Sequence, residues 1–593
     1  MGIHPFKRVG DCRPYMPTVK INIPSKAKLP DLWEDIQPDF PMPSPRKYQA
    51  ESLSVIKWAI ENDDFDNIIL QAPTGIGKSA IAMTLQKWFQ SAYLLTPSLG
   101  LTQQYRRDYS SILKEVKGRS NFPCWVQSGS AKGAPCWKNN KPCPHSLQAD
   151  PCPYYEQKFE ASEARVVLSN PAYIMRVIQG DKSFGQRDLA IIDEAHQIEP
   201  FLLDFLEVKI SQREWELCTG KKDFPFALEA EDWVIPIQKM NASVSALLIN
   251  AESKKDEKAV ERFREILSKT AILVDLLKNP GQVVIEIDRS RSGMKTLITK
   301  PIRVNAFAVE RFDQLSKKRV FMSATILDVD TFTRNLGLDS QKTLFVNVTR
   351  SPFPKDALAI HYAPCGSMSW GKRKHSIPRQ IKAIEAIMKK YPNKRGVILP
   401  HSHDIRKQIV EGLKEAGFED RLITHDSNAM ARDAALDSFF KSERDDLVLV
   451  STYVGEGFDF KGKLAEWLVI CKIPFIPIQN NPVIHRRLSE DEHRWRSKYE
   501  GTPDCPYEPP TKYSSGLCGS FNCPAPCRSW YHLQTALKLV QGAGRLVRTP
   551  TDEGSLFILD GSWSRFARQH LDLFPGWFRS SLRDPPMWLR RHL

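Results

Sequence analysis

The sequence predicts an α/β protein with two parallel-sheet domains, the first of which is interrupted by two insertions. Short apolar runs alternate with helix-sized segments along the chain, and parallel strands need such helical crossovers between them. A glycine-rich turn follows the apolar run 67–70 directly, and comparable runs recur as far as residue 559. Two clusters of cysteines, at 124–152 and 505–527, mark segments with a different chemistry.

Composition indicates a folded protein with a polyanionic partner. The 593 residues are 41% hydrophobic and 26% charged, which is ordinary for globular proteins and argues against disorder. Lysine and arginine outnumber acidic residues by 84 to 69, which gives a net charge of +15. This balance favours nucleic acid as a partner, although charge that serves only solubility is the alternative.

The beginning of the chain predicts an extension rather than a targeting segment. Met1–Pro14 lacks the apolar stretch of a secretory signal, and no run approaches the ~18 apolar residues of a membrane span. We therefore expect an intracellular protein, in the cytoplasm or nucleoid if its source is prokaryotic or viral. Residues 1–43 are rich in proline and lysine, so we expect them to lie over the main body or to be partly mobile.

The segment Gln71–Ser79, Gln-Ala-Pro-Thr-Gly-Ile-Gly-Lys-Ser, predicts a phosphate-binding loop. It follows a strand-like run and opens a helix-like one, so its backbone N–H groups would converge on a polyphosphate. Lys78 would reach the β- and γ-phosphates and the Ser79 hydroxyl would hold Mg²⁺, although Ala72 replaces the first glycine of the generic pattern. The nucleotide-binding candidates in this loop are Thr74, Gly75, Gly77, Lys78 and Ser79.

A second acidic element follows the buried run 189–192. Asp193 lies where a carboxylate would hold Mg²⁺ beside the phosphates, and Glu194 would polarise the attacking water. His196 would couple the nucleotide state to the neighbouring domain. An exposed acidic turn is the alternative, but the phosphate loop upstream argues against it. Gln49, ahead of that loop, could bond adenine through both ends of its amide, or simply begin an exposed helix.

Residues 206–292 predict a helical insertion without chemistry of its own, because apolar residues from Ala259 to Leu277 recur every three or four positions. The strand pattern then returns at 319–322, ahead of Ser323-Ala324-Thr325. A second α/β domain follows from about residue 356, with strand-like runs at 396–399, 447–450, 467–470 and 555–559.

The second domain contains no phosphate loop, so we expect it to complete the first domain's site from across a cleft. Arg545 and Arg548 stand near one helix face, and an arginine finger would neutralise charge on the γ-phosphate in the transition state. The glycines of 455–460 allow close backbone approach, and Glu456 and Asp459 there could orient water or the arginines.

Taken in order, these elements resemble superfamily 2 helicases, specifically the XPD/DinG family of iron–sulfur DNA helicases. The resemblance runs from about residue 44 to 575, and its motifs are specific in combination and in order. The matching segments are Gln71–Ser79, Asp193–His196 (the DEAH box), Ser323–Ile326, Gly455–Phe460 and Gln541–Arg548, with secondary matches at Gly118–Cys124, Ser351–Phe353 and Ile473–Phe475.

The resemblance implies two RecA-like parallel-sheet motor domains, with an iron–sulfur domain and a helical arch domain inserted in the first. It also implies ATP-driven 5′→3′ movement on single-stranded DNA, and unwinding of forked or R-loop-like duplexes by a monomeric motor. The expected ranges are 1–43 for the extension; 44–117, 161–205 and 293–355 for motor domain 1; 118–160 for the iron–sulfur domain; 206–292 for the arch; and 356–593 for motor domain 2, with a cysteine-bearing insertion at about 478–530.

The family's functional residues carry over position by position. Either Arg545 or Arg548 would be the arginine finger, and the sequence leaves open which one it is. Either Gln49 or Arg46 would match the adenine-side motif. The other matched positions are Lys78, Ser79, Asp193 and Glu194 for ATP and Mg²⁺, Gln541 in the arginine motif, and Asn170 and Thr325 for DNA contact and coupling.

Twelve cysteines without an export signal argue for metal binding rather than disulfides. Cys124, Cys136, Cys143 and Cys152 are separated by 11, 6 and 8 residues, wider than the short knuckle of structural zinc sites, and suit a [4Fe–4S] cluster. The resembled family carries its cluster at this place, preceded by an arginine such as Arg119. Four reduced structural thiols are the alternative reading, and His145 is a minor alternative ligand.

Aromatic residues alternate with lysines in the same insertion, for example Trp125, Trp137 and Phe159 with Lys138 and Lys141. They could stack bases and follow phosphates, or simply form the core of a small domain. A second set of cysteines, with gaps of 12, 4 and 3 residues, suits zinc because two gaps fall in the knuckle range, and free thiols in a loop are the alternative. This second set comprises Cys505, Cys518, Cys523 and Cys527.

The sequence therefore predicts an ATP-dependent DNA helicase. A translocase that remodels complexes without separating strands would use the same motor residues, and preference for DNA or an RNA hybrid is left open. A non-catalytic scaffold built on an inactive motor is the third alternative, and the intact Lys78, Asp193, Glu194 and Arg545 argue against it.

Overall fold

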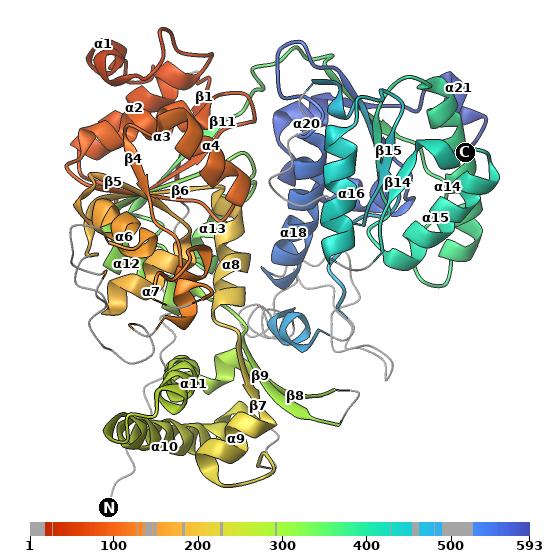
Figure 1. Cartoon of the computed structure of the whole chain (residues 1–593). Coiled ribbons are helices and arrows are strands. Elements are labelled where there is room, and N and C mark those ends of the chain that lie inside the picture. Colours follow the sequence, from red (N-terminus) through yellow and green to blue (C-terminus); the bar gives the residue numbers. More distant parts are fainter. Residues whose placement is uncertain are drawn as a thin grey trace, which may run out of the picture.

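A computed structural model describes residues 18–25, 28–126, 128–134, 136, 145, 151–180, 184–225, 229–290, 293–426, 429–452, 462–478, 481–488 and 526–593. Two α/β domains stand side by side, and a smaller third domain lies below the first (Figure 1). Each of the two large domains is built on a sheet whose strands pair in parallel, which confirms the predicted fold class.

The first α/β domain has an eight-stranded sheet in the order β1-β11-β2-β10-β6-β3-β5-β4. All five residues of its central strand β2 are buried, because helices cover both faces. The strands are β1 (Val19–Ile23), β2 (Asn67–Gln71), β3 (Ala92–Leu95), β4 (Leu113–Glu115), β5 (Val166–Ser169), β6 (Arg187–Asp193), β10 (Ser316–Ser323) and β11 (Thr343–Val348). The helices are α1 (Trp33–Ile36), α2 (Gln49–Glu61), α3 (Lys78–Leu85), α4 (Leu99–Tyr109), α6 (Pro153–Glu163), α7 (Pro171–Gly180), α8 (Ile198–Phe205), α12 (Asn305–Leu315) and α13 (Val329–Asn335).

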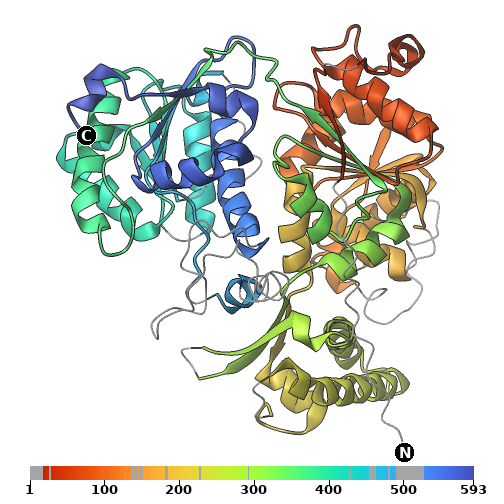
Figure 2. The same cartoon turned by 180° about the vertical axis from the view of Figure 1, so that it is seen from behind.

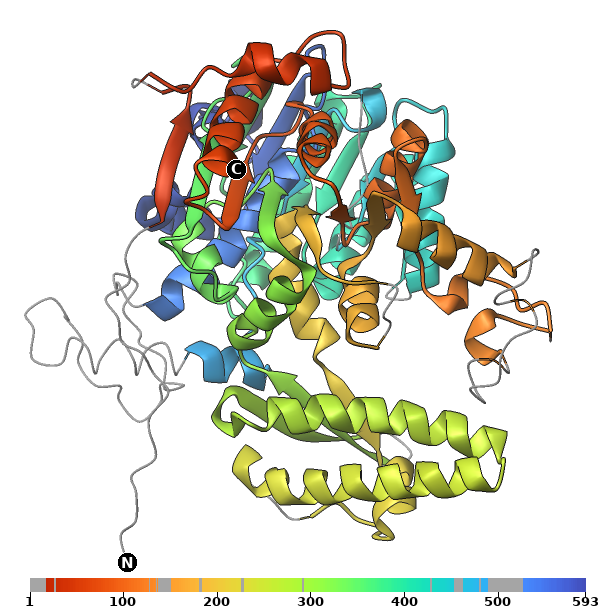
Figure 3. The same cartoon turned by 90° about the vertical axis from the view of Figure 1, so that its left-hand side faces the viewer.

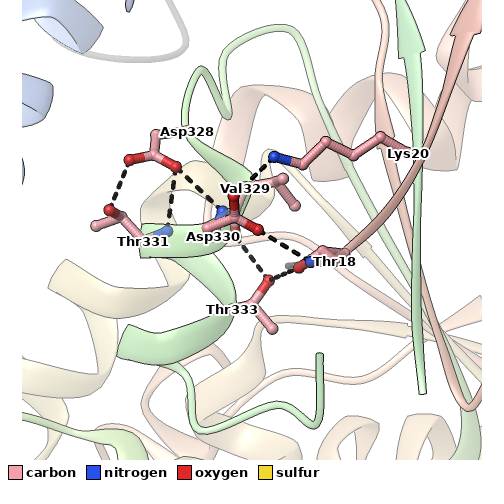
Figure 4. A network of polar contacts seen from close by, with 7 residues as sticks. All are labelled: Thr18, Lys20, Asp328, Val329, Asp330, Thr331 and Thr333. Carbon is pink, nitrogen blue, oxygen red and sulfur yellow. Dashed lines mark hydrogen bonds and ion pairs between the residues drawn. The ribbon is translucent and has the colours of Figure 1, made fainter. Parts of the chain in front are cut away.

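The predicted N-terminal extension contributes a strand to this sheet. β1 pairs in parallel with β11 at the sheet edge, and Ile23 is fully buried in the core. Asp330 at the start of α13 accepts hydrogen bonds from Thr18 N at 3.1 Å and from Lys20 Nζ at 2.7 Å (Figure 4). Residues 18–23 are thus part of the domain rather than a cover laid over it, while residues 1–17 lie outside the described residues.

The third domain pairs two long helices with an antiparallel sheet in the order β7-β9-β8. The prediction of a purely helical insertion was wrong, because these strands are short and their residue pattern differs little from that of a helix end. The predicted boundary at 292 falls inside the β8–β9 hairpin. The domain comprises β7 (Val208–Ser211), α9 (Gln212–Thr219), α10 (Val234–Ser253), α11 (Glu257–Leu276), β8 (Val283–Arg289) and β9 (Lys295–Pro301). Figure 3 shows α10 and α11 lying beneath the rest of the molecule.

The second α/β domain has a seven-stranded parallel sheet in the order β14-β15-β13-β16-β17-β12-β18. Its strands are β12 (Leu358–Tyr362), β13 (Gly396–Leu399), β14 (Leu422–Thr424), β15 (Val448–Val450), β16 (Trp467–Ile470), β17 (Gly554–Ile558) and β18 (Leu582–Arg583). Its helices are α14 (Arg373–Lys390), α15 (His403–Glu415), α16 (Ala429–Lys441), α18 (Pro526–Ala543), α19 (Ser562–His570), α20 (Gly576–Ser580) and α21 (Met587–Arg590). Figures 1 and 2 show α18 on the side that faces the first domain.

In the part of the chain that the structure describes, no helix is both long and apolar enough to cross a membrane.

Candidate active site between the two α/β domains

A cleft of about 530 Å³ lies between the two α/β domains and brings together residues that are hundreds of positions apart. The first domain contributes the carboxyl ends of β2, β6 and β10, where parallel sheets commonly bind ligands. The second domain contributes the end of α18 and the turn after it. Of the residues predicted from the sequence, Thr74, Glu194, His196, Thr325, Gln541, Arg545 and Arg548 line this cleft.

The phosphate loop has the predicted strand–turn–helix context, between β2 and α3. Gly75 and Gly77 both have φ of +86°, a left-handed conformation that side chains other than glycine rarely adopt. A Cβ atom on Gly75 would also overlap the ring of Phe353, which comes from the linker to the second domain. Lys78 and Ser79 open α3, so both start at the helix end where backbone N–H groups attract phosphate.

Arg46 and Gln49 hold the phosphate loop in this structure. Arg46 Nη1 donates to the carbonyl of Gly75 at 2.9 Å, and Gln49 Nε2 donates to the carbonyl of Gly77 at 3.0 Å. Gln49 Oε1 accepts from the backbone N–H of Arg46 at 2.5 Å. Both ends of the Gln49 amide therefore already make hydrogen bonds to backbone groups. The amide would have to break these bonds before it could bond adenine.

Asp193 ends the buried strand β6 and is only 2% exposed. It accepts hydrogen bonds from the Tyr105 hydroxyl at 2.7 Å and from the backbone N–H of Glu194 at 2.8 Å. Burial and the neighbouring Glu194 charge raise the pKa of Asp193. Burial also raises the pKa of Tyr105 well above its usual value, so this residue of α4 acts as a neutral donor. Sequence analysis missed Tyr105, because a tyrosine on an amphipathic helix carries no distinguishing signal.

Glu194 faces a group of cations. Burial alone would raise its pKa, but the charges of Lys78, His196, Arg548 and Arg545, in decreasing order of effect, lower it below the usual value. Glu194 therefore remains a carboxylate, as a residue that orients or activates water must. Its backbone φ of +54° is a left-handed conformation for a residue with a side chain, and such local strain is common at functional sites.

His196 connects the acidic pair to the neighbouring strand β10. Its Nδ1 lies 2.8 Å from Ser323 Oγ, and the same oxygen accepts from the backbone N–H of Thr325 at 3.0 Å. Thr325 is 4% exposed, and its buried hydroxyl makes no hydrogen bond with the described residues. The Gln71 amide oxygen fixes the next turn by accepting from Ile326 N at 2.7 Å. The phosphate loop, the acidic element and this turn thus form one connected set.

Two arginines reach the cleft from the second domain. Arg545 is 9% exposed and lies two residues after the end of α18, and Arg548 lies three residues further on. Both therefore lie in the turn after the helix and not on the helix face that the sequence predicted, because α18 already ends at Ala543. Asp552 accepts from the backbone N–H of Arg548 at 2.8 Å and so shapes the turn that presents it. Gln541 lines both this cleft and a second one, which makes it a direct physical link between them.

The second cleft, of about 560 Å³, lies at the carboxyl ends of β13, β15 and β16. Its first-domain wall comprises His196 in the turn before α8 and Pro200 in the first turn of α8, and its second-domain wall carries His401, Lys472 and Lys538. Burial, followed by the charges of Lys538 and Lys472, lowers the pKa of His401 to about 4, so this imidazole is neutral at pH 7. The cleft is basic and adjoins the active-site cleft.

A buried ion pair ties the second α/β domain to the helix that follows the acidic element. Glu199 of α8 and Arg487 of helix 482–488 approach to 2.7 Å, and both are less than 10% exposed. Asn335 Nδ2 donates to Glu199 at 2.9 Å, and Arg487 stacks on the ring of Trp530 with 3.8 Å between Cζ and the ring centroid. Trp530 belongs to α18, so this cluster anchors the helix that leads to the arginines.

The predicted iron–sulfur segment is described in part. Cys124, Cys136 and Cys152 are free thiols, and Cys143 lies outside the described residues. Arg119 Nη1 donates to the sulfur of Cys136 at 3.8 Å, and its guanidinium stacks on Tyr154 at 4.2 Å. Among the described residues, no three potential ligands approach closely enough to hold a metal ion.

The described aromatic residues of this segment differ in burial, and only their packing in a small core is tested by the structure. Tyr154 is 5% exposed and packs in a small core with Cys152 and Ala131, whereas Trp125 and Phe159 are 45% and 68% exposed. Trp137, Lys138 and Lys141 lie outside the described residues, as do Glu456, Asp459, Cys505, Cys518 and Cys523. Cys527 lies in the first turn of α18, and its side chain is not among those described. Asn170, a predicted DNA contact, accepts from Tyr173 N at 2.8 Å and caps α7.

Comparisons with known proteins agree with this architecture. The family model described as Type III restriction enzyme, res subunit, matches residues 42–201, and the Helicase C-terminal domain model matches residues 384–581. A solved XPD helicase superposes with a TM-score of 0.57 at 14% identity, covering 92% of this chain and 100% of its own. Xpd4 of S. tokodaii superposes with a TM-score of 0.51 at 16% identity, covering 91% and 100%.

A curated relative supports the same class over a short segment. The regulator of telomere elongation helicase 1 homolog of Caenorhabditis briggsae is 25% identical over 129 residues, which are 22% of this chain and 11% of that protein. The two family models match one α/β domain each, and together with the shared fold they support a nucleic-acid helicase similar to XPD.

Proposed function

We propose that this protein is an ATP-dependent DNA helicase that moves 5′→3′ along single-stranded DNA and unwinds forked or R-loop-like duplexes. The observation that carries the proposal is the composite cleft, in which the phosphate loop and Glu194 of one domain face Arg545 and Arg548 of the other. The direction of movement and the preferred duplexes rest on the resemblance to XPD/DinG helicases.

ATP would lie with its phosphates on the loop Gly75–Ser79, next to Lys78. Mg²⁺, held by Ser79 and Asp193, would neutralise charge on the phosphate oxygens. Glu194, kept ionised by the surrounding cations, would orient and activate the attacking water. Arg545 and Arg548 would stabilise the charge that develops on the γ-phosphate. Because these groups belong to two domains, hydrolysis would depend on how closely the domains approach.

Single-stranded DNA would lie in the second cleft, whose walls carry Lys472 and Lys538. His196 and Gln541 line both clefts, so nucleic acid that moves either side chain would also alter the ATP site. This shared wall supports DNA-stimulated hydrolysis. The test is ATP hydrolysis by wild type and Lys78→Ala with and without single-stranded DNA, and strand displacement on forks with 5′ or 3′ tails. DNA-stimulated hydrolysis with unwinding only from a 5′ tail is expected.

Other outcomes identify the alternatives. Stimulated hydrolysis without strand displacement would indicate a translocase that remodels complexes, and equal activity on an RNA hybrid would widen the substrate class. Absence of hydrolysis in the wild type would contradict the proposal and favour a nucleic-acid-binding scaffold.

We also propose that Cys124, Cys136, Cys143 and Cys152 hold a [4Fe–4S] cluster. Four thiolates are the donor set that such a cluster takes, and the Arg119 cation beside Cys136 would stabilise a thiolate there. When bound, the cluster would supply a rigid structural centre for residues 118–160. Protein purified without oxygen should contain about four irons, and Cys136→Ser should lose them, while one additional zinc would indicate a site at Cys505–Cys527. Iron-free wild type would contradict the cluster.

A further inference from the structure

Trp370 has the most exposed side chain among the large hydrophobic residues of the described chain. It is 81% exposed and lies in the loop between β12 and α14. A single exposed apolar side chain is ordinary on a protein surface, so the exposure of this indole is informative only together with its orientation and its surroundings.

The indole is held in a defined orientation. The Arg373 guanidinium lies over its ring at 3.9 Å from the centroid, and Asp404 of α15 fixes that guanidinium through an ion pair of 2.9 Å. The loop backbone is also fixed, because Asp560 accepts from Met368 N at 3.2 Å. With one face on an anchored cation and most of its surface in solvent, Trp370 presents an open aromatic face.

The loop stands next to the second cleft. The other oxygen of Asp560 accepts from the backbone N–H of Ile473 at 3.0 Å, and Ile473 lines that cleft. On the other side, Asp404 directly follows His403, which also lines the cleft. The loop of Trp370 is therefore linked through Asp560 and through Asp404 to residues that line the second cleft, in which we place single-stranded DNA.

The sequence around Trp370 is basic and favours a polyanionic partner, although Asp404 pairs with one of its cations, Arg373. Residues 364–382 carry five basic side chains and no aspartate or glutamate. A protein partner that only covered an apolar side chain would not require this bias, whereas a nucleic-acid strand supplies a base for the ring and phosphates for the cations. The five basic residues are Lys372, Arg373, Lys374, Arg379 and Lys382.

We propose that Trp370 is a base-stacking platform at the rim of the second cleft, where it holds one base of the single strand that occupies the groove. The proposal rests on the proposed function, because it assumes that the second cleft holds nucleic acid. The basic residues beside Trp370 would follow the phosphates of the adjoining nucleotides.

The test compares the binding of a thymidine oligonucleotide and of an abasic strand of equal length by fluorescence anisotropy. Trp370→Ala should weaken binding of the thymidine strand about tenfold, within the usual range for one stacked base, and change binding of the abasic strand little. Trp370→Phe should restore most of the loss. Met587→Ala is the control, since Met587 is 79% exposed on α21, which packs near the far end of α14.

The outcomes separate this proposal from the helicase assignment. ATP hydrolysis without DNA should be unchanged in Trp370→Ala, which also shows that the variant is folded. If wild type binds single-stranded DNA and is stimulated by it, equal affinities of wild type and Trp370→Ala would overturn the platform alone. An equal loss on the thymidine and abasic strands would overturn it too. A wild type that binds neither strand would overturn both proposals.

Discussion

The two α/β domains share a parallel-sheet architecture but turn opposite edges of their sheets toward the active-site cleft. The first domain presents its carboxyl edge, where the phosphate loop, Asp193 and Thr325 lie at the ends of β2, β6 and β10. The second presents its amino edge, because Arg545 and Arg548 lie between α18 and the start of β17. Its carboxyl edge lines the second cleft instead.

This difference shows how one architecture serves two purposes. The carboxyl edge of the first sheet gathers groups that would bind phosphate, and the corresponding edge of the second sheet gathers basic groups around a groove. In the proposed mechanism only the first domain would bind nucleotide by its own loop, so the second would act on the phosphates through arginines alone. Damage to either side should abolish hydrolysis, but for different reasons.

The largest effect is expected from the arginines. Arg545→Ala or Arg548→Ala, whichever removes the finger, should lower kcat about 10³-fold and leave KM for ATP nearly unchanged, since the charge that it neutralises develops only in the transition state. Steady-state ATP hydrolysis measures both constants. Arg583→Ala, which alters an exposed ion pair with Asp356, is the control. If neither variant differs from that control, the second domain does not take part in hydrolysis.

Lys78→Ala tests the other side of the cleft. Loss of the loop lysine removes a cation from both the bound phosphates and the transition state, so kcat/KM should fall about 10²- to 10³-fold. Nucleotide binding and hydrolysis are measured together, with Lys87→Ala, at an exposed lysine in the turn after α3, as the control. Unchanged nucleotide affinity and turnover would contradict the role given to this loop.

The buried pair that joins the domains should affect stability. Arg487→Ala leaves Glu199 buried without its partner, which typically costs about 3 kcal/mol. Thermal melting should show a lower transition temperature, together with reduced DNA-stimulated hydrolysis because α18 loses its anchor. Arg486→Ala is the comparison, because it removes hydrogen bonds to the carbonyls of Gly281 and Val283 in the third domain. It shows whether the loss of any contact of this helix lowers the transition temperature as much as the loss of the buried pair does. Equal melting of Arg487→Ala and wild type would show that the pair contributes nothing.

The smallest effect concerns His401 in the second cleft. Its pKa is about 4 in the folded protein, below that of an exposed histidine, so the unfolded chain binds the proton more readily as pH falls below about 6.5. The neutral His401 side chain makes its full contribution to the free energy of unfolding above that pH. About 1 kcal/mol of this free energy should be lost by pH 5.5. His401→Gln should melt with a smaller difference between pH 7.5 and 5.5 than wild type. Identical differences would mean that the folded protein does not lower the pKa of His401.

The sequence alone predicted the position of those candidate site residues that belong to a short local pattern. The strand, glycine turn and helix of Gln71–Ser79 lie within one short segment, and the same holds for Asp193–Glu194 after a buried strand. Such segments carry their own structural context, so the loop and the acidic element could be placed from their residues alone. The parallel α/β fold followed from the same alternation of strands and helices.

The remaining features depend on contacts between distant parts of the chain. Glu199 and Arg487 are 288 positions apart, and neither neighbourhood indicates a pair. Tyr105 reaches Asp193 across 88 positions, and β1 pairs with a strand more than 300 residues away. Polar side chains on separate helices and one short edge strand leave no periodic signal, so only the folded arrangement identifies their partners.

The most direct test of the central claim is the rate of ATP hydrolysis at saturating ATP as single-stranded DNA is added, for wild type, Arg545→Ala and Arg548→Ala. If catalysis is shared between the domains, DNA should increase the wild-type rate severalfold, and at least one arginine variant should bind the DNA normally without responding to it. Equal stimulation of all three proteins would contradict a composite active site.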